Sequence, residues 1–156
     1  MQVDIIEQAE TIIIGIQANM SLAADNTSAL FRGFMPRNRE ISDGTNQPLF
    51  LIKVYPPNYF TAFNPNTIFT KWLGIKNSSI ENIPEGFDTI IIAAGKYAVF
   101  HYKGLNTDHS IFNYIFQDWL PQSGYQLDER PHFDLLDERY KNNDPESEEE
   151  LWIPIK

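Results

Sequence analysis

Cysteine is absent from this chain of 156 residues. Its absence excludes disulfides, thiolate nucleophiles and cysteine-based zinc or iron–sulfur sites. The three histidines, His101, His109 and His132, lack the spacing of metal ligands with one another or with acids on one helix face. We therefore expect neither a metal site nor another cofactor.

Long apolar runs are missing as well. The isoleucine runs at residues 12–14 and 90–92 have the length of a strand and are too short to span a bilayer. Asp4, Glu7 and Glu10 lie where a secretion signal would carry positive charge. These features predict a cytoplasmic protein that makes no contact with a membrane.

Positive charge is scarce, because 12 lysines and arginines face 21 aspartates and glutamates, for a net charge of −9. Such a surface repels polyanions, so direct binding to nucleic acid is not expected. Its summed field would instead weakly enrich cationic ligands. We interpret the late acidic run as a solvated loop or strand entry; it consists of Asp144, Glu146, Glu148, Glu149 and Glu150.

Several catalytic motifs are also lacking. Ser123 is not part of a Gly-x-Ser-x-Gly turn, and no glycine-rich loop could cradle a phosphate. The acidic pairs at residues 128–129 and 137–138 are adjacent, so on a strand their side chains would point to opposite faces. The sequence thus favours a binding protein over an enzyme, without deciding between them.

What the chain does contain is a regular alternation of strand and helix patterns. Patterns rich in β-branched and aromatic residues predict strands over residues 3–6, 11–17, 49–54, 67–75, 87–93, 96–102, 131–137 and 149–155. Helices are predicted over residues 23–37 and from 107 or 108 to about 119. Asp25, Asn26 or Thr27 could cap the first helix, whereas Pro121 and Gly124 should end the second.

The two halves, residues 1–76 and 86–156, follow the same order. Trp72 and Trp152 stand in matching strand ends, the strands at Phe50 and Phe133 correspond, and both helices end in an apolar residue followed by proline. This order predicts an internal duplication within one domain, residues 1–156. Two βαββ units would pair into one antiparallel sheet of an α+β fold, with both helices on one face and a ligand groove on the other.

The second half resembles a known family. The resemblance is carried by residues 95–104, the helix end at 119–125, Pro131-His132-Phe133-Asp134 and the closing residues 152–155. In order and spacing these segments are similar to the GyrI-like small-molecule-binding superfamily, which includes the effector-binding domains of AraC- and MerR-type multidrug regulators and stand-alone members. The resemblance implies two pseudo-symmetric βαββ units around an aromatic groove.

The same resemblance implies a carboxylate in the groove. In the family it is usually a glutamate on the strand after the second helix, and the matching residue here is Asp134, with Leu136 where an aromatic often stands. A carboxylate beside an apolar neighbour must be paired, hydrated or directed at a ligand, so a pair with Arg130, Lys96 or another base is the alternative. The candidate ligand-binding residues are Asp134, Trp72, Tyr97, Trp152, Leu136 and Phe34. Packing in the core is the alternative for the aromatic ones.

These observations together predict a stand-alone module, because the chain begins directly at the first strand. It would capture amphipathic, cationic small molecules in an aromatic groove, in transcription regulation or drug resistance, and could serve a separately encoded regulator or other protein. Two alternatives stay open. Asp134 could activate water in a hydrolase of electrophilic compounds, or the acidic surface could bind a basic protein, as in a gyrase inhibitor.

Overall fold

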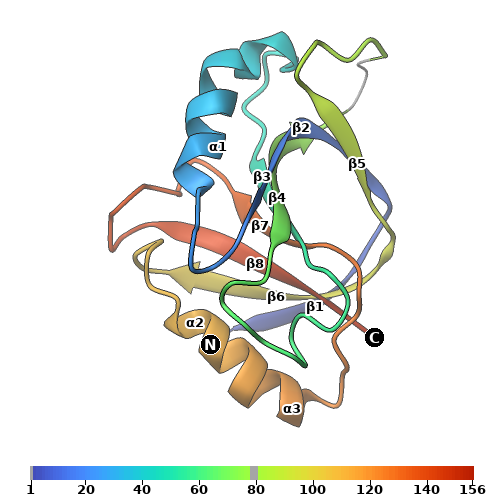
Figure 1. The fold of residues 1–156 in the computed structure, drawn as a ribbon, viewed down its shortest axis with the longest axis vertical. Coiled ribbons are helices and arrows are strands. Elements are labelled where there is room, and N and C mark those ends of the chain that lie inside the picture. The colour runs from blue at the N-terminus through green and yellow to red at the C-terminus, as the bar shows by residue number, and fades with distance from the viewer. Residues whose placement is uncertain (1, 78–80) are drawn as a thin grey trace.

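A single antiparallel sheet organises the protein. The computed structural model describes residues 2–77 and 81–156, and within them eight strands are ordered β1-β6-β8-β7-β3-β4-β2-β5 (Figure 1). The strands are β1 (Val3–Gln8), β2 (Thr11–Met20), β3 (Leu49–Val54), β4 (Phe69–Lys76), β5 (Asp88–Ile92), β6 (Gly95–Lys103), β7 (His132–Leu136) and β8 (Glu148–Ile155). The predicted α+β architecture with one antiparallel sheet is confirmed.

The order of the strands reflects the duplication. Outward from the centre, one half gives β7, β8 and β6, and the other gives β3, β4 and β2. Leu51 on β3 lies directly opposite Asp134 on β7. Trp72 lies opposite Ile52, and Trp152 lies opposite Phe133. The two tryptophans are therefore equivalent about a pseudo-twofold axis that passes between β3 and β7.

Both helical layers cover the same face of the sheet. The first is α1 (Thr27–Phe34) with a 3-10 turn, η1 (Met35–Glu40), and the second is α2 (Ser110–Asn113), the π-helical η2 (Tyr114–Trp119) and α3 (Leu120–Ser123). Leu51 belongs to the core beneath α1, and Leu151 to the core beneath α2. Asp134 lies between them, directly opposite each, and residues opposed in this way share a face.

The other face of the sheet carries a core cluster of its own, where the sequence predicted a ligand groove. This cluster takes side chains from all eight strands, including Ile6 of β1 and Ile92 of β5 at the two ends of the sheet. The sheet curls around this cluster (Figure 1). Gly15 and Gly74 help the sheet to curl. They lie opposite each other, and a Cβ on either would collide with the backbone of the other's strand.

The helices differ from the predicted ones at their ends. The first begins at Thr27 and not at residue 23, because the Asp25 carboxylate accepts the Thr27 N–H at 2.8 Å and holds the chain in a turn there. The second continues past Pro121 to Ser123. The Leu120 N–H donates to the carbonyl of Ile115, five residues back, and this widened turn precedes the proline.

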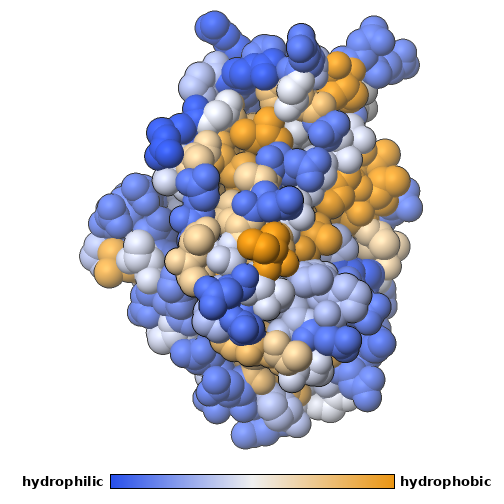
Figure 2. All heavy atoms as spheres, viewed as in Figure 1, coloured by the Kyte–Doolittle hydropathy of each residue, from blue (hydrophilic) through white to orange (hydrophobic). Residues whose placement is uncertain are grey.

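No helix in the described part of the chain is long and apolar enough to cross a membrane. On the surface, apolar residues gather over β2 and β5, on the right of the view in Figure 2. Ile12 and Ile91 lie directly opposite each other there and are 43% and 56% exposed.

Candidate functional site

The centre of the helix-bearing face lies between the two helical layers, and the loop of residues 55–68 crosses it. This loop joins β3 to β4 and appears in green beside the α2–α3 layer in Figure 1. Beneath it, β3 and β7 place charged side chains next to the pseudo-twofold axis. The central part of this face therefore holds the polar groups that the helices leave uncovered.

The main polar contact is an ion pair between Lys53 and Asp134. The Lys53 ammonium nitrogen lies 3.0 Å from each carboxylate oxygen, and the two side chains are only 10% and 9% exposed. The same nitrogen lies 4.5 Å from the centre of the Phe112 ring. Lys53 thus places a cation between a carboxylate and an aromatic face, where the sequence predicted a ligand cation. The partners considered from sequence lie elsewhere, since Arg130 pairs with Asp128 at 2.7 Å.

A second buried lysine lies directly across from the first. Lys71 on β4 is opposite Lys53 in the strand register, and it donates a hydrogen bond to the Thr27 hydroxyl at 2.7 Å. Its nitrogen lies 3.7 Å from Asp25, whose side chain is 38% exposed. Burial, followed by repulsion from Lys53, lowers the pKa of Lys71. Like charges at opposed strand positions are destabilising. The two opposed lysines therefore lower the stability of the fold, which suggests a role in function.

Aromatic rings close the site from above. Phe60 of the loop stacks on His132 with ring centres 5.4 Å apart and contacts Phe116 at 4.7 Å. The Tyr55 and His132 rings pack edge to face with their centres 4.9 Å apart. The centre of the Tyr55 ring also lies 4.5 Å from that of Tyr59. The Tyr59 hydroxyl is buried and has no hydrogen-bond partner in the described part of the chain. A buried hydroxyl without a partner costs about 1–3 kcal/mol, which a ligand with a polar group could recover.

Burial keeps the histidine and tyrosine at this site uncharged. Desolvation, reinforced by the charges of Lys53 and Arg130, lowers the pKa of His132 to about 3. Desolvation and the negative charge of Asp134 raise the pKa of Tyr55 well above its usual range. At neutral pH, both rings therefore present neutral aromatic surface.

Glu149 departs from its expected role. We interpreted it as part of a solvated run, but it lies on β8 two residues before Leu151 and so shares the face of Asp134. Burial and the charge of Asp134 raise the pKa of Glu149 to about 8, against a smaller lowering by Lys53. This raised pKa favours the protonated carboxyl at neutral pH. The ionisable side chains Lys53, Lys71 and Asp134 are the more deeply buried neighbours of Glu149.

The structure does not bring the six predicted ligand residues together. Asp134, Leu136 and Phe34 lie on the helix-bearing side, the latter two in the core beneath α1. Trp72, Tyr97 and Trp152 belong to the cluster on the opposite face. Trp152 stacks on Phe133 at 5.0 Å, and the Tyr97 hydroxyl donates to the Pro131 carbonyl at 2.8 Å. The sheet separates these two groups, so one groove cannot be lined by both.

Sequence reasoning missed the two lysines. Lys53 follows Leu51 at a spacing of two, and Lys71 precedes Leu73 at the same spacing, so each shares a strand face with a core leucine. A charged group beside an apolar neighbour needs a partner, and this holds for the two lysines as it does for Asp134. The aromatic cover had no comparable signal, because residues 55–68 carry no periodic pattern that predicts where a loop packs.

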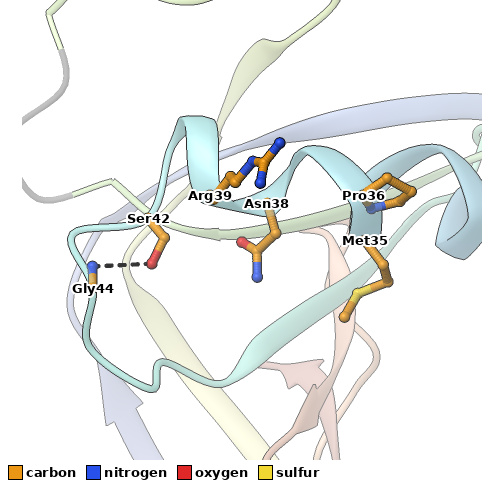
Figure 3. Close-up of a pocket in the computed structure, with 6 residues that line it drawn as sticks. All are labelled: Met35, Pro36, Asn38, Arg39, Ser42 and Gly44. Atoms are coloured by element: carbon orange, nitrogen blue, oxygen red, sulfur yellow. Dashed lines mark hydrogen bonds between the residues drawn. The ribbon is translucent and has the colours of Figure 1, made fainter.

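A surface hollow lies elsewhere, beside the 3-10 turn (Figure 3). It has a volume of about 460 Å³ and is lined by Met35, Pro36, Asn38, Arg39, Ser42 and Gly44. The Met35 and Arg39 side chains point in different directions, and the hydrogen bonds from the Gly44 N–H to the Ser42 hydroxyl and from the Ser42 N–H to the Asn38 carbonyl are both local. Arg39 is the one ionisable residue among them, so we place the functional site at the centre of the sheet.

Comparison with known proteins agrees with this architecture. All of the chain, residues 1–156, matches the family described as the GyrI-like small molecule binding domain. The chain belongs to this family. GyrI-like proteins are thus the reference for the central site, and the resemblance inferred from the second half extends over both halves.

The relatives include regulators and a ligand-bound protein. The transcriptional regulator BrlR of Pseudomonas aeruginosa is 28% identical over 99% of this chain, which spans 56% of BrlR. A structure of SAV2435 bound to tetraphenylphosphonium superimposes with a TM-score of 0.67 and 15% identity, covering 100% of this chain and 94% of SAV2435. The EcmrR C-terminal domain superimposes with a TM-score of 0.69 and 14% identity, covering 99% of this chain and 97% of that domain. At such identities the two structures establish the fold alone.

Proposed function

We propose that this GyrI-like chain binds amphipathic aromatic small molecules between its two helical layers, over the Lys53–Asp134 pair. The observation that carries the proposal is a buried polar pair at the centre of the sheet, with aromatic residues of a loop beside it and the Phe112 ring of α2 against the Lys53 ammonium. Polar groups buried at a domain centre need partners, and a loop can move aside more easily than a packed helix. Ligand binding would then replace Tyr55 and Phe60 above the pair.

The chemistry of the walls supports an aromatic ligand. Phe112 and Phe116 project from the second helical layer, and Phe60 contacts Phe116 and stacks on His132. An aromatic ligand that displaced Phe60 could make the same contacts, each worth about 0.5–1.5 kcal/mol beyond the area buried. The related regulators support a sensing role, in which the bound ligand changes how this chain acts on another protein.

The cationic ligand expected from the sequence meets a competitor. A cation seeking Asp134 would have to displace the Lys53 ammonium, which already contacts both carboxylate oxygens and the Phe112 ring. The displaced lysine would then lie buried and unpaired beside Lys71, at a cost of several kcal/mol. A cationic ligand remains compatible with the site only if Glu149 ionises to receive it.

Calorimetric titration tests the proposal. Tetraphenylphosphonium and tetraphenylborate are probes of matched shape and opposite charge, and at least one should bind saturably with a stoichiometry of one. Phe112→Ala should weaken that binding roughly fivefold or more, because it removes an aromatic wall. Phe63→Ala is the matched control, since Phe63 belongs to the loop but is 57% exposed. Saturable binding of neither probe would refute the proposal, as would equal losses in both variants.

Hydrolysis of an electrophilic compound is the second candidate, and Glu149 favours it. A carboxyl group whose pKa is raised to about 8 by burial and by Asp134 suits a general base near neutral pH, which Asp134 does not while Lys53 holds it. Incubation with electrophilic esters and epoxides should then release more than one equivalent of product per chain. Glu149→Gln should abolish that turnover, and product limited to one equivalent would exclude it.

A further inference from the structure

The two opposed lysines point to the charge of the ligand. Lys53 and Lys71 face each other across β3 and β4 on the helix-bearing face, and each residue is less than a tenth exposed. Antiparallel register places such side chains close together. A chain with net charge −9 has many acids with which it could have neutralised this pair. Of the acids that the structure describes, Asp134 is the one less than a tenth exposed there.

The hydrogen bonding of the lysines leaves room for a further acceptor. A lysine ammonium has three donors. In the described part of the chain, Lys71 donates to the Thr27 hydroxyl at 2.7 Å, and its ion-pair partner Asp25 lies 3.7 Å away with a side chain that is 38% exposed. The Lys53 ammonium is shared between the two oxygens of Asp134. Burial lowers the pKa of Lys71, and the two ammonium groups lie close enough for the charge of Lys53 to lower it further.

We propose that the site between the two helical layers takes an amphipathic ligand with an anionic group, such as a carboxylate, sulfonate or phosphate, held between the ammonium groups of Lys53 and Lys71. This inference rests on the proposed function and specifies the class of its ligand. The aromatic part of the ligand would lie against Phe112 and Phe116. Its anionic end would accept hydrogen bonds from the remaining N–H donors of Lys71. The neutral state of His132 and Glu149 at neutral pH supports this distribution of charge.

The two matched probes show whether the site prefers a negative or a positive ligand. At about 0.15 M sodium chloride, where long-range attraction to the acidic surface is screened, tetraphenylborate should bind at least about tenfold more tightly than tetraphenylphosphonium. Lys71→Met should remove most of this preference, whereas Lys71→Arg should keep it. Lys103→Met is the control, because the Lys103 side chain is 56% exposed at a distant surface.

Each result has a distinct meaning. Tighter binding of the phosphonium, or a borate preference that survives Lys71→Met, would overturn the anionic ligand while leaving the proposed function standing. Binding of neither probe would overturn both. If Lys71→Met does not fold, the preference of the unmodified protein and its retention in Lys71→Arg still decide the sign.

Discussion

Lys53 lies with its ammonium nitrogen 3.0 Å from both oxygens of Asp134, at the pseudo-twofold axis of the sheet. Trp72 and Trp152 lie opposite Ile52 and Phe133, and these two residues are directly opposed to each other, so Lys53 and Asp134, each one residue further along its strand, occupy equivalent positions. The ion pair thus breaks the symmetry of two otherwise corresponding halves. It polarises the central site, with positive charge toward β4 and negative charge toward β7.

Breaking this pair from one side should be costly. Asp134→Asn leaves the Lys53 ammonium buried without a counter-charge, and we expect the free energy of unfolding to fall by about 3–5 kcal/mol. Urea denaturation followed by circular dichroism measures it. Asp137→Asn is the control, since Asp137 pairs with Arg139 at the surface and should cost less than about 1 kcal/mol. Similar small losses in both variants would mean that the central pair is not buried as described.

The face assignment predicts a separation of stability from binding. Trp152 lies on the side of the sheet away from Lys53 and stacks on Phe133. Trp152→Phe should therefore lower the free energy of unfolding by roughly 1–3 kcal/mol and leave the probe dissociation constants unchanged within about twofold. Calorimetry on the folded variant measures both probes. A loss of affinity comparable to that of Phe112→Ala would place the ligand on the opposite face.

Glu149 gives the site a pH signature. Its pKa is raised from 4.5 in the unfolded chain to about 8, so between these values the folded protein holds a proton that the unfolded chain has released. Stability should therefore fall as pH rises through this window, with a slope from this group of up to about 1.4 kcal/mol per pH unit. Glu149→Gln should lack this contribution and gain stability relative to wild type as pH rises.

The exposed neighbour provides the comparison. Glu148 lies beside Glu149, with a side chain that is 43% exposed, and Glu148→Gln should follow the wild-type profile. Denaturant unfolding at half-unit intervals from pH 5 to pH 8 resolves the difference. Parallel profiles for wild type and Glu149→Gln would show that the Glu149 carboxyl ionises normally in the folded protein.

Sequence reasoning succeeded where a local pattern carried the information. The equivalence of Trp72 and Trp152 predicted the duplication, and alternation along the strand at Phe133 placed Asp134 and Leu136 on a common face. It did not identify that face as the one covered by the helices. Alternation tells which residues share a side of the sheet, but not which side the helices cover. The tryptophans were assigned to the groove for that reason, although their size suits the core that the curled sheet encloses.

The partner of Asp134 could not be predicted for a different reason. Lys53 is 81 residues away in the chain, and only the pairing of β3 with β7 brings the two together. Arg130 and Lys96 are nearer in sequence or in the second half, but the Arg130 guanidinium lies over the ring of Tyr97, on the other face. Strand order, which no single strand encodes, decides such contacts.

A structure of the chain saturated with whichever tetraphenyl probe binds more tightly tests the central claim most directly. We predict that the probe lies between the two helical layers, in contact with Phe112 and Phe116, with Tyr55 and Phe60 displaced from above Lys53. A probe bound beside Met35 in the surface hollow, or on the side of Trp72 and Trp152, would contradict the account.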